Sequence, residues 1–304
     1  MIRGRSAAVL GLSAVCIGVL LGTVPARAES ERRVTIRFAA QVADQPFACG
    51  RSYEGIGSTR SRVTPSDFRF YVSDVALLDE AGKPVPLKLD QDEHWQYRNV
   101  ALLDFEDRSG PCLTGTREMR DVVTGNVPGG RYRGLRFTLG VPFDLNHADA
   151  TIAPSPLNLT SLFWNWQAGY KFLRIDLATS GRAQDVTPDQ QPRFGDKAAS
   201  LRLGFAIHLG STQCAANNAA SPSESCANPN RSTILLADFD PEHDVVVADL
   251  AALLDGVNVD TNQADTPAGC MSTPSDGDCD PLMRNLGLTF AGQPGIQKFF
   301  RVKH

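Results

Sequence analysis

The side chains with the greatest chemical potential lie in the short run Phe163–Phe172, which holds two of the chain's three tryptophans. These two residues, Trp164 and Trp166, form a W-x-W motif. An unmodified indole offers one N–H donor and no lone pair, so the encoded motif cannot by itself bind a metal ion. Large aromatic side chains usually pack in cores. The motif therefore predicts a core cluster, unless one ring is altered after translation.

Cysteines are the second chemical feature. C-terminal to the apolar N-terminal segment the chain has six cysteines, and an even number predicts disulfides in an exported protein. They are Cys49, Cys112, Cys214, Cys226, Cys270 and Cys279. The sequence leaves their pairing open. No C-x-x-C motif occurs, which argues against a zinc ribbon or thioredoxin-like site, and copper ligation by free thiolates is the competing interpretation.

The N-terminus has the pattern of a secretory signal peptide. Arg3 and Arg5 supply positive charge. An apolar run follows at Ala7–Leu21, and Ala26-Arg27-Ala28 is an A-x-A cleavage site. We expect residues 1–28 to be cleaved and the mature chain to enter a bacterial periplasm. A retained anchor helix is the less favoured alternative, because the apolar run is short for a membrane span.

The composition excludes several functional classes. The formal net charge is −4 and no run is rich in Lys or Arg, so the pattern of a nucleic-acid or anionic-membrane binder is missing. No P-loop, dinucleotide-binding fingerprint or G-x-S-x-G motif occurs, and we expect no enzymatic activity. The acidic segment 238–244 lacks the glycine and closing glutamate of an EF-hand, which favours a solvated turn. Small molecules, metals and protein partners remain.

Hydrophobic alternation predicts a mainly β protein. Strand patterns occupy residues 34–40, 68–75, 85–89, 132–139, 171–177, 201–209 and 233–239. Helical periodicity is limited to residues 116–123, 157–166 and 246–254, and residues 180–197 predict a long loop. We expect one domain, residues 29–304, built as an antiparallel β-sandwich or open barrel with long disulfide-tied loops and a few short helices. Lys171 and Arg174 alternate with apolar residues and are expected to face solvent.

Longer motifs extend through most of the chain. They are DFRFYVS at 67–73, VALLDFE at 100–106, FTLGVPF at 137–143, NH at 146–147, PLNL at 156–159, FWNWQAGYKF at 163–172, HLGSTQC at 208–214, DFD at 238–240, VADL at 247–250 and GCMS at 269–272. Together they resemble the metallo-mystery pair four-cysteine family, which includes the methanobactin-associated, MbnP-like copper-binding proteins. The resemblance covers nearly all of the expected mature chain.

The resemblance implies a periplasmic protein of copper homeostasis that binds one copper ion, expected as Cu(I). It also implies a partner, a di-haem protein of the bacterial cytochrome c peroxidase/MauG type, which oxidises the first tryptophan of the W-x-W motif to kynurenine. In this chain that residue is Trp164, while Trp166 stays an indole. Opening the indole creates an aniline nitrogen and a ketone oxygen, whose lone pairs would make the modified Trp164 a possible metal ligand.

Imidazoles are the strongest candidates for the other copper ligands, because His is the commonest metal ligand in proteins. Of the five histidines we expect His147 and His208 to bind the ion. His147 follows Asn146 in a family-like stretch, and His208 lies near the end of an apolar strand. The competing interpretation is that His147 caps a loop and His208 is a hydrogen-bonded strand residue. Five other candidates are assigned to the surface or to loop packing: His94, His243, His304, Met271 and Met283.

Two other functions fit the sequence. A disulfide-stapled β-sandwich module would bind a partner through exposed aromatic residues of the Phe163–Tyr170 segment, without any metal. A catalytic copper enzyme is less favoured, because neither a second ligand cluster nor an acid/base pair is evident. A metal assay separates the copper-binding protein from the metal-free module.

Overall fold

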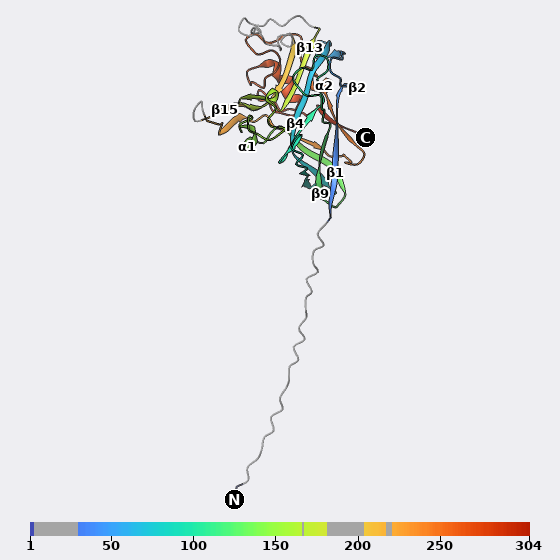
Figure 1. Cartoon of the computed structure of the whole chain (residues 1–304), viewed down its shortest axis with the longest axis vertical. Helices are drawn as coiled ribbons and strands as arrows, with labels where there is room; N and C mark the ends of the chain where they lie inside the picture. The colour runs from blue at the N-terminus through green and yellow to red at the C-terminus, as the bar shows by residue number, and fades with distance from the viewer. Residues whose placement is uncertain (3–29, 166, 181–203, 217–220) are drawn as a thin grey trace.

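The computed structural model describes residues 1–2, 30–165, 167–180, 204–216 and 221–304. These residues form two large β-sheets, two small hairpins and a few short helices (Figure 1). Nearly all of the expected signal peptide, Trp166, and residues 181–197 of the expected long loop lie outside the described residues.

The first large sheet is built around the N-terminal strand. Its order is β19 (Phe300–Lys303), β18 (Val245–Asp249), β1 (Glu31–Val42), β9 (Val122–Pro128) and β6 (Lys88–Leu89), with β2 (Gln45–Pro46) added beside β1. β1 and β18 are parallel, and the other pairs are antiparallel. Val34, Ile36 and Phe38 alternate inward along β1, as the sequence pattern predicts.

The second large sheet is antiparallel and is centred on the long strand β4. Its order is β14 (Gly204–Leu209), β13 (Leu173–Thr179), β4 (Ser61–Asp79), β10 (Tyr132–Leu139) and β17 (Ser232–Leu236). Four short strands extend it: β3 (Tyr53–Ile56), β5 (Pro84–Pro86), β7 (Gln96–Tyr97) and β8 (Val100–Asp104).

Aromatic side chains join the two sheets face to face. Phe38 of β1 lies 5.7 Å from Phe137 of β10, measured between ring centroids. Phe300 of β19 lies 5.5 Å from Phe70 of β4. Edge-to-face contacts of this kind add to the burial of apolar area that stabilises a sandwich core. The expected mainly antiparallel β architecture is therefore confirmed, and within the described residues neither sheet closes into a barrel.

The outer face of β4 is also buried, and it is polar. Asp67, Arg69 and Tyr71 alternate with the core phenylalanines and are each at most 1% exposed. The Tyr71 hydroxyl donates to the carbonyl of Pro156 at 2.9 Å, and Arg69 Nη1 donates to Ser161 Oγ at 3.2 Å. The segment from Pro156 to Ser161 thus covers this face and leads directly into the W-x-W motif.

Short elements surround that covered face. They are α1 (Phe143–Asn146), η1 (Thr160–Leu162), β11 (Phe163–Asn165), β12 (Gly169–Tyr170), β15 (Thr212–Ala215), β16 (Ser225–Asn228), α2 (Leu250–Leu253), η4 (Gly277–Cys279) and α3 (Asp280–Asn285). In Figure 1, α1 and β15 lie together on one flank, away from the C-terminus. Within the described ranges, no helix has both the length and the apolar character needed to cross a membrane.

The six cysteines form three disulfides. They are Cys49–Cys112, Cys214–Cys226 and Cys270–Cys279. The first joins positions 63 residues apart, whereas the other two close local loops. The expectation of disulfide-tied loops is confirmed, and such bonds are typical of exported proteins.

The three expected helices are wrong or much shorter than predicted. Residues 116–123 contain no helix and enter β9, where Val123 pairs with Ile36 of β1. Residues 157–165 hold one 3₁₀ turn and then β11. In 246–254 a strand precedes the four-residue α2. Val-rich or aromatic segments with suitable cross-strand partners become strands, because packing outweighs local periodicity.

Candidate metal centre

Trp164 lines a cavity of about 420 Å³ between the two small hairpins. The indole is half-buried. The lining residues come from β11 and its turn, from the start of β15, and from the C-terminal third of the chain: Trp164, Asn165, Gln167, Ala168, Ser211, Thr212, Gln213, Cys214 and Met271. The first tryptophan of the motif therefore borders an open pocket and is not fully buried in the core.

Local sequence fixes the hairpin that carries Trp164. Phe163 pairs with Tyr170 across β11 and β12. In the turn, Asn165 Oδ1 accepts hydrogen bonds from the backbone nitrogens of Gln167 at 3.0 Å and Ala168 at 2.8 Å. Gly169 has a φ of 81°, and a Cβ there would lie 2.4 Å from the Asn146 side chain. An Asx turn closed by glycine thus holds the motif in place.

The Trp164 ring packs directly on Gly210, two residues beyond His208 along the chain. A Cβ at position 210 would lie 2.4 Å from Trp164 Cζ3 and 2.7 Å from the carbonyl oxygen of Tyr170. Only a residue without a side chain leaves room for the indole at this point. The indole consequently lies beside the end of the strand that carries His208.

Replacing Gly210 with Ala should displace the Trp164 ring and destabilise the fold by about 1–3 kcal/mol, the usual effect of overpacking. Near-ultraviolet circular dichroism and thermal unfolding measure the two effects. Gly130→Ala is the matched control, because the nearest atom to a Cβ there lies 3.6 Å away. Indistinguishable spectra and midpoints for the two variants would contradict the close packing of Trp164 on Gly210.

His208 belongs to a buried ionic cluster across β14, β13 and β4. Strand pairing sets His208 opposite Arg174, and Arg174 opposite Arg69. His208 Nε2 lies 2.7 Å from Asp176 Oδ1, and Arg174 Nε donates to Asp176 Oδ2 at 2.8 Å. Arg69 and Arg174 share the carboxylate of Asp67. Each buried charge therefore has an opposite partner, as buried ions require.

The surroundings of His208 favour a neutral imidazole. Burial lowers its pKa and outweighs the opposing effect of Asp176. Burial favours the neutral acid of Asp176, but His208 and Arg174 nevertheless hold its pKa below the ordinary value. Because a carboxylate only accepts, Nε2 of His208 carries the proton and Nδ1 keeps the lone pair. In metal-binding histidines, one ring nitrogen usually donates a hydrogen bond to a group such as a carboxylate, which orients the other nitrogen toward the metal.

Lys171 and Arg174 are not solvent-facing, so that expectation is wrong. Arg174 is 8% exposed, and its Nη1 donates to the carbonyl of Ser161 at 3.0 Å. Lys171 Nζ donates to the same carbonyl at 3.0 Å. Burial, with Arg174 nearby, lowers the pKa of Lys171 to about 8. Lys171 and Arg174 do alternate with apolar residues, but the segment before Trp164 covers the outer face of this sheet.

A third carboxyl, near Arg69 of the cluster, makes stability depend on pH. Burial raises the pKa of Asp104 to about 8, despite the favourable charge of Arg69. The folded protein therefore holds a proton that the unfolded chain releases near pH 4, and stability should fall as pH rises from about 4 to 8, by at most about 1.4 kcal/mol per pH unit. Asp104→Asn should flatten that part of the profile of unfolding free energy against pH. An unchanged slope would contradict a protonated Asp104.

Met271 approaches the cavity from a third direction. The backbone nitrogen of His208 donates to the carbonyl of Cys270 at 2.9 Å, and Ser272 Oγ donates to the carbonyl of His208 at 2.9 Å. These bonds fix the Cys270–Ser272 segment along β14, so that the Met271 side chain lines the cavity with Trp164. Sequence reasoning assigned Met271 to loop packing. The family-like GCMS motif was the available signal for its position at the cavity.

His147 lies in different surroundings from His208. It follows α1, and its Nε2 lies 3.4 Å from Cys226 Sγ. Asn146 Oδ1 accepts from the Tyr170 nitrogen at 2.8 Å, so its Nδ2 is the atom 3.1 Å from His147 Nε2. The two predicted imidazoles thus flank the β15–β16 region from separate clusters. That both bind the same ion stays a prediction.

The other sequence candidates lie where loop or surface roles were expected. Each of the three remaining histidines pairs with a carboxylate and has a side chain more than half exposed: His94, His243 and His304. Met283 is 1% exposed within α3. The acidic segment 238–244 is a hydrogen-bonded turn, in which the Asp240 nitrogen donates to Asp244 at 2.7 Å.

The aromatic cluster after Trp164 is mostly enclosed. Tyr170 and Phe172 are fully buried, and Phe163 packs on Tyr170 with ring centroids 4.9 Å apart. Phe163 itself is half-buried. The metal-free module would need several of these rings at the surface as a contact patch. The geometry therefore gives that alternative little support.

Comparison with known proteins agrees with this geometry. A sequence model of the MbnP family matches residues 31–272, a range that includes the cavity and both candidate histidines. Among solved structures, MbnP from Methylosinus trichosporium is 31% identical with a TM-score of 0.75, and the match covers 90% of this chain and 98% of that chain. No protein with a curated description matches. The family match over most of the chain, together with the shared fold, shows that the chain belongs to the MbnP family.

Proposed function

We propose that this chain is a methanobactin-associated, periplasmic copper-binding protein of copper homeostasis, without enzymatic activity of its own. One observation carries the proposal: Trp164 and Met271 line the same cavity, beside the strand end that carries a neutral, carboxylate-backed His208. Imidazole and thioether are ligands that Cu(I) favours. Family membership supports a copper-related role.

The third ligand would come from Trp164 after oxidation. We propose that a di-haem partner of the cytochrome c peroxidase/MauG type uses two molecules of hydrogen peroxide to open the indole. The indole gains two oxygen atoms and loses four electrons in forming N-formylkynurenine, and two molecules of water are released. Hydrolysis then releases the formyl carbon as formate and leaves kynurenine. Its aniline nitrogen and ketone oxygen have the lone pairs that the indole lacks. The half-buried position of Trp164 beside the cavity suits this change, because the polar product can reach the cavity.

Export is part of the proposal. Cleavage after Ala28 would leave a mature chain whose first described strand begins at Glu31. Three disulfides fit an oxidising compartment.

Copper content with and without the partner tests the proposed function. The mature chain is purified after expression alone and after co-expression with a di-haem protein of the cytochrome c peroxidase/MauG type. We expect one tightly held copper ion per chain after co-expression, and none that survives dialysis without the partner. Equal copper content in the two preparations would overturn the dependence on the partner. A copper-free protein with kynurenine at position 164 would overturn the metal site.

Asp176→Asn should weaken copper binding by about 10–100-fold, the usual effect of removing the partner that orients a metal-binding histidine. The amide can still accept from His208 Nε2 but no longer carries the charge that favours this tautomer. Competition with a coloured Cu(I) chelator measures the affinity. Asp238→Asn is the control, because that carboxylate is exposed in a pair with Arg133. Equal affinities for both variants would count against His208 as a ligand.

A further inference from the structure

We propose that reduction of the Cys214–Cys226 disulfide creates a second soft-metal site, in which the two thiolates and His147 bind Cu(I). This inference goes beyond the proposed function, because it needs neither the oxidation of Trp164 nor His208. The reductant would be a dithiol, of the kind that thiol–disulfide exchange proteins supply.

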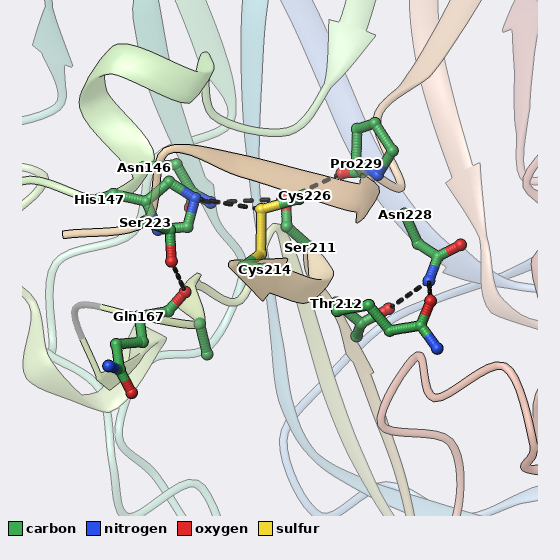
Figure 2. Close-up of a disulfide and its surroundings, with 12 residues drawn as sticks. Asn146, His147, Gln167, Ser211, Thr212, Cys214, Ser223, Cys226, Asn228 and Pro229 are labelled. Atoms are coloured by element: carbon green, nitrogen blue, oxygen red, sulfur yellow. Dashed lines mark hydrogen bonds between the residues drawn. A yellow bond between two sulfur atoms is a disulfide. The ribbon is translucent and has the colours of Figure 1, made fainter. Parts of the chain in front are cut away.

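The three ligand atoms are already together (Figure 2). The Sγ atoms of Cys214 and Cys226 and one ring nitrogen of His147 all lie within 4.8 Å of one another. His147 Nε2 is 3.4 Å from Cys226 Sγ. Two thiolates and one imidazole form a three-coordinate soft set, which is suited to Cu(I).

Hydrogen bonding leaves Nε2 of His147 unprotonated. Because Asn146 Oδ1 accepts from Tyr170, its Nδ2 is the donor that faces His147 Nε2 at 3.1 Å. The ring nitrogen that receives this bond is unprotonated. The imidazole nitrogen nearest Cys226 therefore has a lone pair that a metal ion would take over from the Asn146 donor.

The hairpin has connections that do not depend on the S–S bond. Thr212 pairs with Asn228 across β15 and β16, and Asn228 Nδ2 donates to Gln213 Oε1 at 3.0 Å. Ser211 Oγ donates to the carbonyl of Pro229 at 2.9 Å. Ser223 Oγ donates to the carbonyl of Gln167 at 2.8 Å, which joins this region to the W-x-W hairpin (Figure 2). Reduction would leave the two sulfurs on paired strands, close to their present positions.

Exposure distinguishes this disulfide from the other two. Cys214 and Cys226 are both half-buried, so a reducing dithiol can reach them. Cys270 and Cys279 are 1% and 0% exposed. In the remaining pair Cys49 is also half-buried, but Cys112 is 0% exposed, so only the Cys214–Cys226 bond has both cysteines partly exposed. Access to the sulfur is a main determinant of thiol–disulfide exchange rates. The Cys214–Cys226 bond should therefore be reduced first.

The chemistry balances without any further reactant. Thiol–disulfide exchange breaks the Cys214–Cys226 bond and converts it to two thiols, while the dithiol loses two electrons and two protons and becomes a disulfide. Binding of Cu(I) then releases the two thiol protons. Because Cys214 also lines the Trp164 cavity, copper binding at one site should change the copper affinity of the other.

The test uses the mature chain expressed without the di-haem partner, so that Trp164 is unmodified. The protein is reduced anaerobically with dithiothreitol, desalted and titrated with Cu(I) against bicinchoninic acid, while differential alkylation and mass spectrometry identify the free thiols. We expect free thiols at Cys214 and Cys226, and one bound Cu(I) per chain that the unreduced protein does not retain. Free thiols mainly at other cysteines, or equal Cu(I) retention before and after reduction, would overturn the proposal.

Three comparisons assign the ligands. Alkylating the reduced wild-type protein blocks both sulfurs in a chain that is already folded, and should abolish Cu(I) binding, as should Cys214→Ser combined with Cys226→Ser. His147→Gln should weaken binding at least about tenfold, since one of three ligands is lost. His94→Gln, at an exposed histidine, should leave the Cu(I) affinity unchanged.

Unaltered affinity in His147→Gln would remove His147 from this site. Loss of the partner-dependent copper in that same variant would return His147 to the Trp164 site and contradict the proposal.

Discussion

Replacing Trp164 with Phe should abolish partner-dependent copper retention and leave the fold intact. Phenylalanine keeps an aromatic ring against Gly210 but cannot be opened to give an aniline nitrogen and a ketone oxygen. Loss of a direct ligand should weaken binding by more than the roughly 10–100-fold seen when an outer-shell partner is lost. Copper per chain after co-expression and dialysis measures the effect, and circular dichroism checks the fold.

Two matched tryptophan variants make that result specific. Trp95 is half-buried and packs edge-on against His94, on a turn outside the cavity. Trp95→Phe should therefore retain copper. Trp166→Phe should also retain it, because the proposed oxidation is confined to the first tryptophan. Full retention in Trp164→Phe, or equal losses in all three variants, would contradict a role confined to Trp164.

Replacing Arg69 with Met should destabilise the protein by up to about 3–5 kcal/mol, the usual effect of breaking a buried ion pair by removing one member. Arg69 is 1% exposed, and its guanidinium holds Asp67 through two hydrogen bonds, one of them 2.8 Å long. Burial alone would lower the pKa of Arg69, but Asp67 raises it. The change removes the cation that binds Asp67 through two hydrogen bonds and leaves this buried carboxylate with Arg174 as its remaining cation. Chemical denaturation measures the loss.

A second substitution identifies the cause of that loss. Asp67→Leu combined with Arg69→Met removes both charges and should be less destabilising than Arg69→Met alone, because no unpaired ion remains. Arg133→Met is the surface control. Its pair with Asp238 has both side chains 76% exposed, and such exposed pairs contribute about 0–1 kcal/mol. Equal losses from Arg69→Met and Arg133→Met would contradict a buried network.

Much of the sandwich could be predicted from alternation along single strands. The pattern at residues 34–40 identifies a strand because every second side chain reaches the core. The outer face of β4 could not be predicted in the same way. Asp67 and Arg69 alternate like exposed residues, yet they are buried because Arg174 and the segment before Trp164 cover them. The covering residues lie more than 90 positions away in the sequence, so the local periodicity of β4 gives no information about them.

The candidate site was also only partly predictable. The W-x-W motif and both histidines were visible as residue types with possible metal chemistry. Their grouping was not, because His208 meets Asp176 through strand pairing and His147 meets Cys226 through a hairpin. Met271 reaches the cavity only because the Cys270–Ser272 segment bonds along β14. Long-range pairing of this kind depends on the whole fold.

The mass of residue 164 in protein purified from its native host is the most direct test of whether Trp164 is converted to a copper ligand. The tryptic peptide that ends at Lys171 contains both tryptophans, and fragmentation distinguishes position 164 from position 166. Copper-loaded protein should carry kynurenine at position 164 and an intact indole at position 166, while copper-free protein should retain the indole at both positions. Copper-loaded protein with an unmodified Trp164 would contradict the account.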